Sequence, residues 1–117
     1  MARKLFATKW IELLENERGN AFVRMGDGVL IVPITPDREV ILLKEYSVAY
    51  DRPMLLLPGG AIDEGENEHI AVNRELQEEI GQKAEKLTYL GTLHPQSKYL
   101  HWEFKVYLAQ GLLASKL

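Results

Sequence analysis

Gly-Gly-Ala-Ile-Asp-Glu-Gly-Glu, residues 59–66, is the stretch that decides the fold, because a helical pattern follows it directly. Asn67 is a suitable N-cap, since its side-chain oxygen can accept hydrogen bonds from the free amides of a first helical turn. Apolar residues then recur every four positions, at Val72, Leu76 and Ile80. This spacing predicts a helix with one face against a core. Gly81 predicts the end of that helix, because glycine enters the left-handed conformation without a Cβ penalty.

The polar side of the predicted helix carries three glutamates. Glu75, Glu78 and Glu79 stand at i, i+3 and i+4, so their carboxylates should meet on one patch and repel. A hard divalent cation such as Mg²⁺ relieves this repulsion, because it prefers carboxylate oxygens. The alternative is a solvated acidic face, in which Arg74 and Glu78 form an ordinary i, i+4 ion pair.

The loop and the helix together resemble the Nudix box, here residues 59–82. The matching positions are Gly60, Glu66 and the run Arg74-Glu75-Leu76-x-Glu78-Glu79-x-Gly81. So many fixed residues over 23 positions make the match far more specific than a lone glycine motif. At the last position the family usually has an aliphatic residue, whereas this chain has Gln82. Because Gln82 follows the helix, the departure bears on local packing rather than on metal binding.

The resemblance implies a Nudix hydrolase, which cleaves a nucleoside diphosphate linked to another moiety. It implies that Mg²⁺, or Mn²⁺ in its place, is held by four residues: Glu75, Glu78, Glu79 and the backbone carbonyl of Gly59. Glu78 is either a ligand or the base. Arg74 is expected to orient Glu66 and Glu75 through charge-assisted hydrogen bonds, so that Glu66, Arg74, Glu75 and Glu78 form the catalytic group. The alternative for Glu66 is a carboxylate that only interacts with the helix dipole.

Outside the box, the chain resembles the branch of ADP-ribose pyrophosphatases and ADP-compound hydrolases. The resemblance rests on Val-Ile-Leu-Leu-Lys-Glu-Tyr at 40–46 and Leu-Pro-Gly-Gly at 57–60. It implies Mg²⁺-dependent hydrolysis of an ADP-linked small molecule, such as ADP-ribose, to AMP and a phosphorylated product. Ser47 and Ser97 stand where ADP-ribose enzymes carry an arginine and a proline, which leaves other ADP compounds open. Two alternatives are a nucleotide-binding regulatory domain without turnover and a nucleoside triphosphate pyrophosphatase.

Four residues are candidates for binding the substrate: Trp10, Tyr46, Arg52 and Tyr99. In relatives, N-terminal segments contribute to the nucleotide site across a dimer interface, so Trp10 is expected to stack on adenine. Tyr46 and Arg52 could reach a base or a ribose, and Tyr99 lies in a loop that could border the site. The alternative for each residue is an ordinary structural or surface role.

Composition limits the class of protein. The chain has 117 residues, which is enough for one domain with a single core. The formal net charge of −3 argues against an extended nucleic-acid groove. The chain has no cysteine, no apolar signal core and no apolar run long enough to span a membrane. These features are typical of a cytoplasmic protein that acts on a small molecule.

The remaining patterns predict strands on both sides of the helix. An N-terminal hairpin is expected within 1–25, followed by strands at 29–33, 40–44, 54–57, 87–93 and 102–108, with a weak tail from 109 to 117. The apolar runs at 29–32 and 40–43 predict strands that are covered on both faces. We therefore expect one α+β domain with a mixed sheet over residues 1–117. The family resemblance sharpens this to an α/β/α sandwich whose C-terminal strand and helix are missing, and implies a homodimer.

Overall fold

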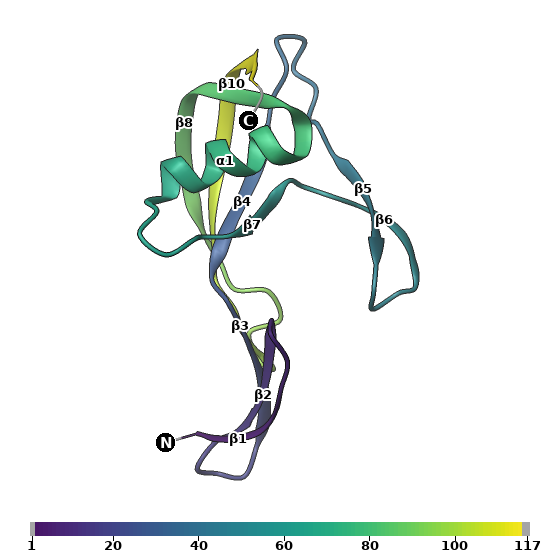
Figure 1. Cartoon of the computed structure of the whole chain (residues 1–117), viewed down its shortest axis with the longest axis vertical. Coiled ribbons are helices and arrows are strands. Elements are labelled where there is room, and N and C mark those ends of the chain that lie inside the picture. The colour runs from purple at the N-terminus through teal and green to yellow at the C-terminus, as the bar shows by residue number, and fades with distance from the viewer. Residues whose placement is uncertain (1, 116–117) are drawn as a thin grey trace.

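A computed structural model describes residues 2–115, which form one helix and ten strands (Figure 1). The strands are β1 (Arg3–Ala7), β2 (Ile11–Glu15), β3 (Ala21–Met25), β4 (Gly28–Pro33), β5 (Leu43–Ser47), β6 (Arg52–Leu56), β7 (Gly59–Ala61), β8 (Gln82–Leu93), β9 (Leu100–His101) and β10 (Phe104–Ala114), and the helix is α1 (Glu68–Ile80). No helix in the described part of the chain is long and apolar enough to cross a membrane.

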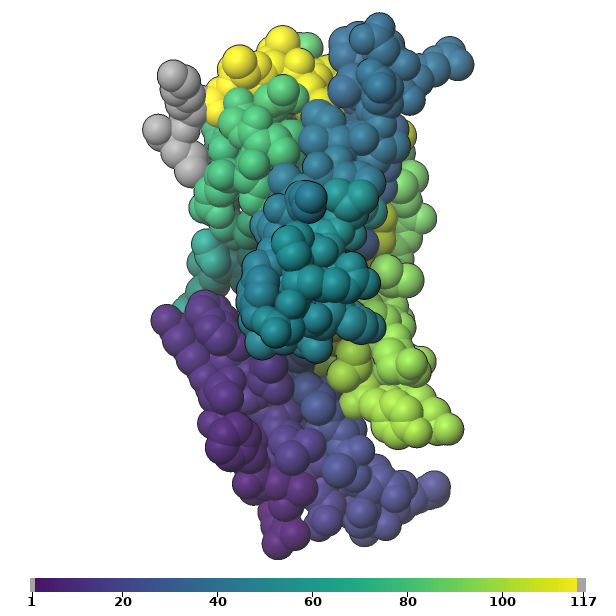
Figure 2. Space-filling model, turned by 90° about the vertical axis from the view of Figure 1, so that its right-hand side faces the viewer, coloured from purple at the N-terminus to yellow at the C-terminus, as the bar shows by residue number. Residues whose placement is uncertain are grey.

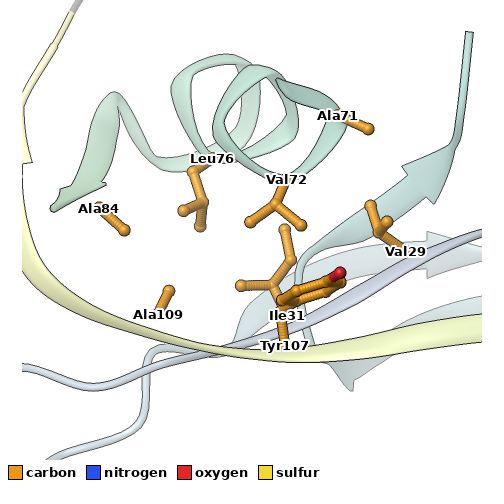
Figure 3. Packing of buried hydrophobic residues seen from close by; sticks show 8 residues of the cluster. All are labelled: Val29, Ile31, Ala71, Val72, Leu76, Ala84, Tyr107 and Ala109. Carbon is orange, nitrogen blue, oxygen red and sulfur yellow. The ribbon is translucent and has the colours of Figure 1, made fainter. Parts of the chain in front are cut away.

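The core lies between α1 and a sheet with strand order β7-β4-β10-β8. β4 and β10 are parallel, and the other two pairings are antiparallel, so the predicted mixed sheet is confirmed. Figure 3 shows Val72 and Leu76 of α1 pointing toward Ile31 and Tyr107 of the sheet. Strand alternation places 29, 31, 107 and 109 on this face, and 30, 104, 106 and 108 on the opposite face. Within residues 2–115, α1 is the single helix, so these residues supply one helical layer.

Both ends of α1 follow the sequence prediction. The Asn67 side-chain oxygen accepts a hydrogen bond from the Ile70 amide at 2.8 Å. Gly81 adopts the left-handed conformation, with φ of 66°, and its amide hydrogen bonds to carbonyls of the last turn. Val72 and Leu76 are completely buried, and Ile80 packs against the core. These contacts fix which face of the helix carries the glutamates.

The N-terminal segment forms a second sheet, with strand order β1-β2-β3-β9. β2 and β3 form the expected N-terminal hairpin, with a turn at 16–20 in which the Asn16 side chain accepts hydrogen bonds from the amides of Arg18 and Asn20. The segment also contains β1, which is separated from β2 by residues 8–10. Figure 2 shows these strands, in purple, forming one end of an elongated molecule.

The strand expected at 40–44 is wrong. Val40 forms only an isolated bridge to Ile34, and regular pairing begins at Leu43, where β5 joins β6. Tyr46 therefore lies within strand β5. The expected burial on both faces holds for β4, which lies between β7 and β10. It fails for 40–43, where Val40 and Leu42 are exposed, because this segment has left the main sheet.

The expected weak tail after residue 108 is also wrong. β10 continues to Ala114, and β8 begins at Gln82 rather than at Leu87, because these two strands form one long antiparallel ladder. The ladder ends with Ala114 opposite Gln82. Residues 116–117 of the predicted tail lie outside the described residues. Leu100 and His101, which follow the loop that contains Tyr99, form β9, and β9 pairs with β3.

Candidate active site

The glycines before α1 allow the backbone of β7 to approach the helix and β4 closely. A Cβ on Gly60 would lie 2.4 Å from Glu75 Oε1. A Cβ on Gly59 would lie 2.4 Å from the backbone oxygen of Val29. Both distances are shorter than a real contact allows, so neither position accepts a side chain without displacing its neighbours. This close approach brings β7 against the acidic face of α1.

Arg74 links the loop and the helix. Its guanidinium binds both carboxylate oxygens of Glu66, with Nε–Oε2 at 2.6 Å and Nη2–Oε1 at 3.1 Å. Nη1 donates to Glu75 Oε1 at 3.0 Å, and Nη2 donates to the Ala61 carbonyl at 2.9 Å. The hydrogen bond with Arg74 holds the pKa of Glu66 below its ordinary value. The same bond raises the pKa of Arg74, so both groups stay charged.

Asp63 supports this arrangement, although sequence reasoning gave it no role. Its backbone amide donates to Glu66 Oε1 at 2.8 Å, and its carboxylate lies 3.2 Å from Arg74 Nε. Glu66 therefore does more than interact with the helix dipole, because two residues, Asp63 and Arg74, donate hydrogen bonds to its carboxylate. The sequence hint of a role for Asp63 was the density of acidic residues in 63–66, but spacing alone did not show which carboxylate faced Arg74.

Glu75 and Glu79 meet beside Gly59. The Gly59 amide donates to Glu79 Oε1 at 3.2 Å. Burial, followed by the hydrogen bond with the Glu75 carboxyl, raises the pKa of Glu79 to about 8. Two carboxyl groups this close favour a shared proton or a cation between them.

Glu78 is turned toward Arg74. Its Oε2 lies 3.3 Å from Arg74 Nη1, and its side chain is 43% exposed, so the i, i+4 ion pair considered above is formed. Within residues 2–115, no three His, Asp or Glu side chains already surround one point that could hold a metal ion. An exposed i, i+4 pair of this kind contributes only about 0.3–0.5 kcal/mol. Releasing Glu78 toward its neighbours therefore costs little.

The residues present fit a hard divalent cation. The groups that meet beside Gly59 are the carboxylates of Glu75 and Glu79, and carboxylate oxygens are ligands that Mg²⁺ and Mn²⁺ prefer. The raised pKa of Glu79 marks a place where positive charge is needed in order to keep both carboxylates ionised. Glu75 is 8% exposed and its other side is held by Arg74, so its orientation is fixed.

The four expected substrate-binding residues do not lie together. Trp10 borders a cavity of about 590 Å³ that reaches Gly59 and Gly60. Tyr46 is exposed and its hydroxyl donates to Asp51, while Arg52 lies 6.0 Å from the ring centroid of Tyr50. Tyr99 is exposed beside Lys98. Tyr46, Arg52 and Tyr99 are not among the residues that line this cavity.

The same cavity contains aromatic residues to which sequence reasoning assigned no function. Trp102 and Phe104 line it together with Met25, Leu56 and Leu57. The alternation at 102–108 predicted a strand, which was correct from Phe104 onward. The pattern could not show that Trp102 approaches Gly26 and the glycines of β7, because these segments are far apart in sequence.

Comparisons with known proteins agree on one family. The model of the NUDIX domain matches residues 24–112. The ADP compounds hydrolase NudE of Escherichia coli (strain K12) is 38% identical over 78% of the chain and 48% of its own length. An ADP-ribose pyrophosphatase of Bacillus subtilis (strain 168) is 26% identical over 88% of the chain and 58% of its own length.

A crystal structure of an ADP compounds hydrolase superimposes with a TM-score of 0.80. It is 32% identical, and the match covers 100% of this chain and 68% of the other. The chain spans about half the length of the curated relatives it matches.

Proposed function

We propose that this chain, which belongs to the NUDIX domain family, hydrolyses the pyrophosphate bond of an ADP-linked small molecule such as ADP-ribose, and that it requires Mg²⁺. The products would be AMP and a phosphorylated partner. The observation that carries the proposal is the meeting of Glu75 and Glu79 beside Gly59, with Glu75 held by Arg74. Support for an ADP compound comes from the relatives named as an ADP compounds hydrolase and an ADP-ribose pyrophosphatase.

Glu75, Glu79, Glu78 and the Gly59 carbonyl would hold the metal, for which Mn²⁺ could substitute. When bound, it supplies positive charge that neutralises the diphosphate and lowers the pKa of a coordinated water. Hydrolysis would add a water molecule across the phosphoanhydride: an oxygen–phosphorus bond forms at one phosphorus, the bond from that phosphorus to the bridging oxygen breaks, and the second phosphate leaves with the bridging oxygen.

The chain's own residues would fix the geometry of this reaction. Arg74 is a positioning residue, because it holds Glu75 and neutralises Glu66 without being required to touch the substrate. Glu66 keeps the guanidinium in place through two hydrogen bonds. Glu78 can accept the proton of the attacking water or serve as a ligand, since its ion pair with Arg74 is weak and exposed.

A substrate panel tests the proposal. ADP-ribose, NADH, a diadenosine polyphosphate, a sugar nucleotide and a nucleoside triphosphate would be incubated with the chain, with Mg²⁺ or with a chelator. We expect AMP from ADP-linked substrates only when Mg²⁺ is present. Faster hydrolysis of the triphosphate would favour the pool-cleaning alternative. Binding of ADP-ribose without any product would instead favour a regulatory domain.

We also propose that the chain is a cytoplasmic homodimer. The N-terminal segment exposes several apolar side chains, among them Phe6 of β1 at 65% and Trp10 of the β1–β2 connection at 72%, and such surface favours association. Light scattering during size-exclusion chromatography should give twice the mass of the chain. A monomer at all micromolar concentrations would contradict the dimer.

A further inference from the structure

The cavity next to β7 has an aromatic wall. Trp102 and Phe104 line it from one side, and their ring centroids are 4.5 Å apart with an interplanar angle of 55°. Its volume of about 590 Å³ is within the range of ~300–1,000 Å³ that is usual for small-molecule sites. Trp10 lines the same cavity and exposes most of its ring.

Trp102 is held in position without a substrate. Its Nε1 donates a hydrogen bond of 2.9 Å to the Gly26 carbonyl, and one side of its ring meets Phe104. A ring that is fixed in this way loses little conformational freedom when a ligand stacks on it. Within residues 2–115, no hydrogen bond anchors the Trp10 indole nitrogen in this way, and Lys9 Nζ lies 4.9 Å from the ring centroid of Trp10.

The cavity and the glutamates share one edge strand. β7 is at the edge of its sheet, and its residues Gly59, Gly60 and Ala61 line the cavity. The same strand meets Glu79 through the Gly59 amide, and it meets Glu75 at Gly60. A nucleotide could therefore place its diphosphate at the glutamates and its base in the cavity by passing along this exposed edge.

The apolar lining of the cavity determines which part of the nucleotide can bind there. Among the described residues that line the cavity, Lys9 is the one with a charged side chain, and the others are apolar, aromatic or glycine. A diphosphate would be desolvated there with too few partners, which is costly. The desolvation cost is smaller for a flat aromatic base, because the base can stack on Trp102 and displace water from the apolar lining.

We propose that Trp102, backed by Phe104, stacks on the aromatic base of the nucleotide and sets the preference for substrates that carry one. This inference rests on the proposed function, since it places the base relative to the diphosphate site. It makes Trp102 a substrate-contacting residue and separates recognition of the base, at the cavity, from chemistry, at Glu75 and Glu79.

Three variants test the role of Trp102: Trp102→Leu, Trp102→Phe and the control Tyr89→Leu. Tyr89 is half-exposed and pairs with Tyr107, whose ring lies on the opposite face of the sheet from Phe104. For Trp102→Leu, we expect KM for ADP-ribose to rise about tenfold or more, which is the loss of one base–aromatic stack, while kcat changes little. KM for a dialkyl diphosphate without a base should stay unchanged. Trp102→Phe should recover much of the affinity, and Tyr89→Leu should behave as the wild type.

Calorimetric titration with AMP in chelator separates this inference from the proposed hydrolysis. If the wild type hydrolyses nothing but binds AMP, and Trp102→Leu weakens that binding, the base site stands and the proposed hydrolysis fails. If hydrolysis occurs but Trp102→Leu leaves KM and AMP affinity unchanged, the base site is refuted. Equal losses for the base-containing and base-free diphosphates would also refute it, because they indicate a structural role. Equal losses in Trp102→Phe and Trp102→Leu would assign the effect to the hydrogen bond with Gly26 and not to stacking.

Discussion

α1 and the β5–β6 hairpin differ in how they are held. α1 packs on the mixed sheet, and Ala71, Val72 and Leu76 are completely buried. The hairpin forms a two-stranded sheet of its own that extends from the body, and Val48 in its turn is 87% exposed (Figure 1). An isolated hairpin is only marginally stable in water, whereas a packed helix shares the stability of the whole core.

This difference indicates where chemistry can be carried out. Metal ligands must be held within fractions of an ångström, so they belong on an element whose rotamers are fixed by packing. The glutamates of α1 meet this condition through Arg74, Gly59 and the core beneath the helix. Tyr46 and Arg52, on the hairpin, have only local contacts and could shift without disturbing the glutamates.

The largest expected effect is on turnover. Glu79→Gln should lower kcat by ~10³-fold or more at saturating Mg²⁺, because metal stabilisation of the transition state contributes several kcal/mol. Glu85→Gln, on the exposed part of β8, is the matched control and should retain full activity. Steady-state hydrolysis of ADP-ribose measures both. Unchanged activity of Glu79→Gln would show that Glu79 of α1 has no part in catalysis. The tighter packing of α1 would then not explain where the reaction takes place.

The next effect is on folding. Leu76→Ala should lower the free energy of unfolding by about 2–5 kcal/mol, because a completely buried side chain leaves a cavity in the core. Leu55→Ala, on β6 and 67% exposed, should change it by about 0.5 kcal/mol or less. Urea denaturation followed by circular dichroism gives both values. Similar losses for the two variants would mean that the hairpin is buried in solution, for example by a second copy of the chain.

The part of the molecule that could be predicted is the part that local sequence specifies. Asn67, the four-residue apolar spacing and Gly81 determined the helix bounds, because capping and periodicity act within a few residues. The pairing of Arg74 with Glu66 also followed from the motif. The Arg74–Glu78 ion pair was predicted as the alternative to a metal-binding patch. The involvement of Asp63 did not follow from the sequence, since several carboxylates compete for one guanidinium.

The features that escaped prediction depend on distant pairing. Residues 109–114 belong to the predicted weak tail, yet they extend β10 along β8. Residues 40–42 have the composition of a buried strand, but the turn at 35–39 directs them away from the main sheet. The cavity brings Trp10 and Trp102 together from opposite ends of the chain. No local sequence pattern predicts such a long-range contact.

A smaller effect should appear in the pH dependence of stability. The folded-state pKa of Glu79 is raised to about 8, above its value of 4.5 in an unfolded chain. Between these values the metal-free folded protein keeps a proton that the unfolded chain releases, so its free energy of unfolding falls as the pH rises through this window. The side chain introduced by Glu79→Gln cannot ionise, so the free energy of unfolding of this variant should not fall in that pH window. Melting temperatures from pH 5 to 9 in chelator should therefore diverge in favour of the variant, and Mg²⁺ should reverse the order above pH 8.

The smallest expected effect concerns Gln82, which stands where the family usually has an aliphatic residue. Its side-chain oxygen is buried and has no hydrogen-bond partner among the described residues. A buried polar group without a partner costs about 1–3 kcal/mol, so Gln82→Leu should raise the free energy of unfolding by about 1 kcal/mol. Gln82 lies beyond the Gly81 cap, at the start of β8, so Mg²⁺ affinity and kcat should not change. Urea denaturation and metal titration of this variant would show that packing of the body and chemistry at its acidic face can be altered separately. A parallel change in Mg²⁺ affinity would instead show that the end of α1 transmits strain to Glu79.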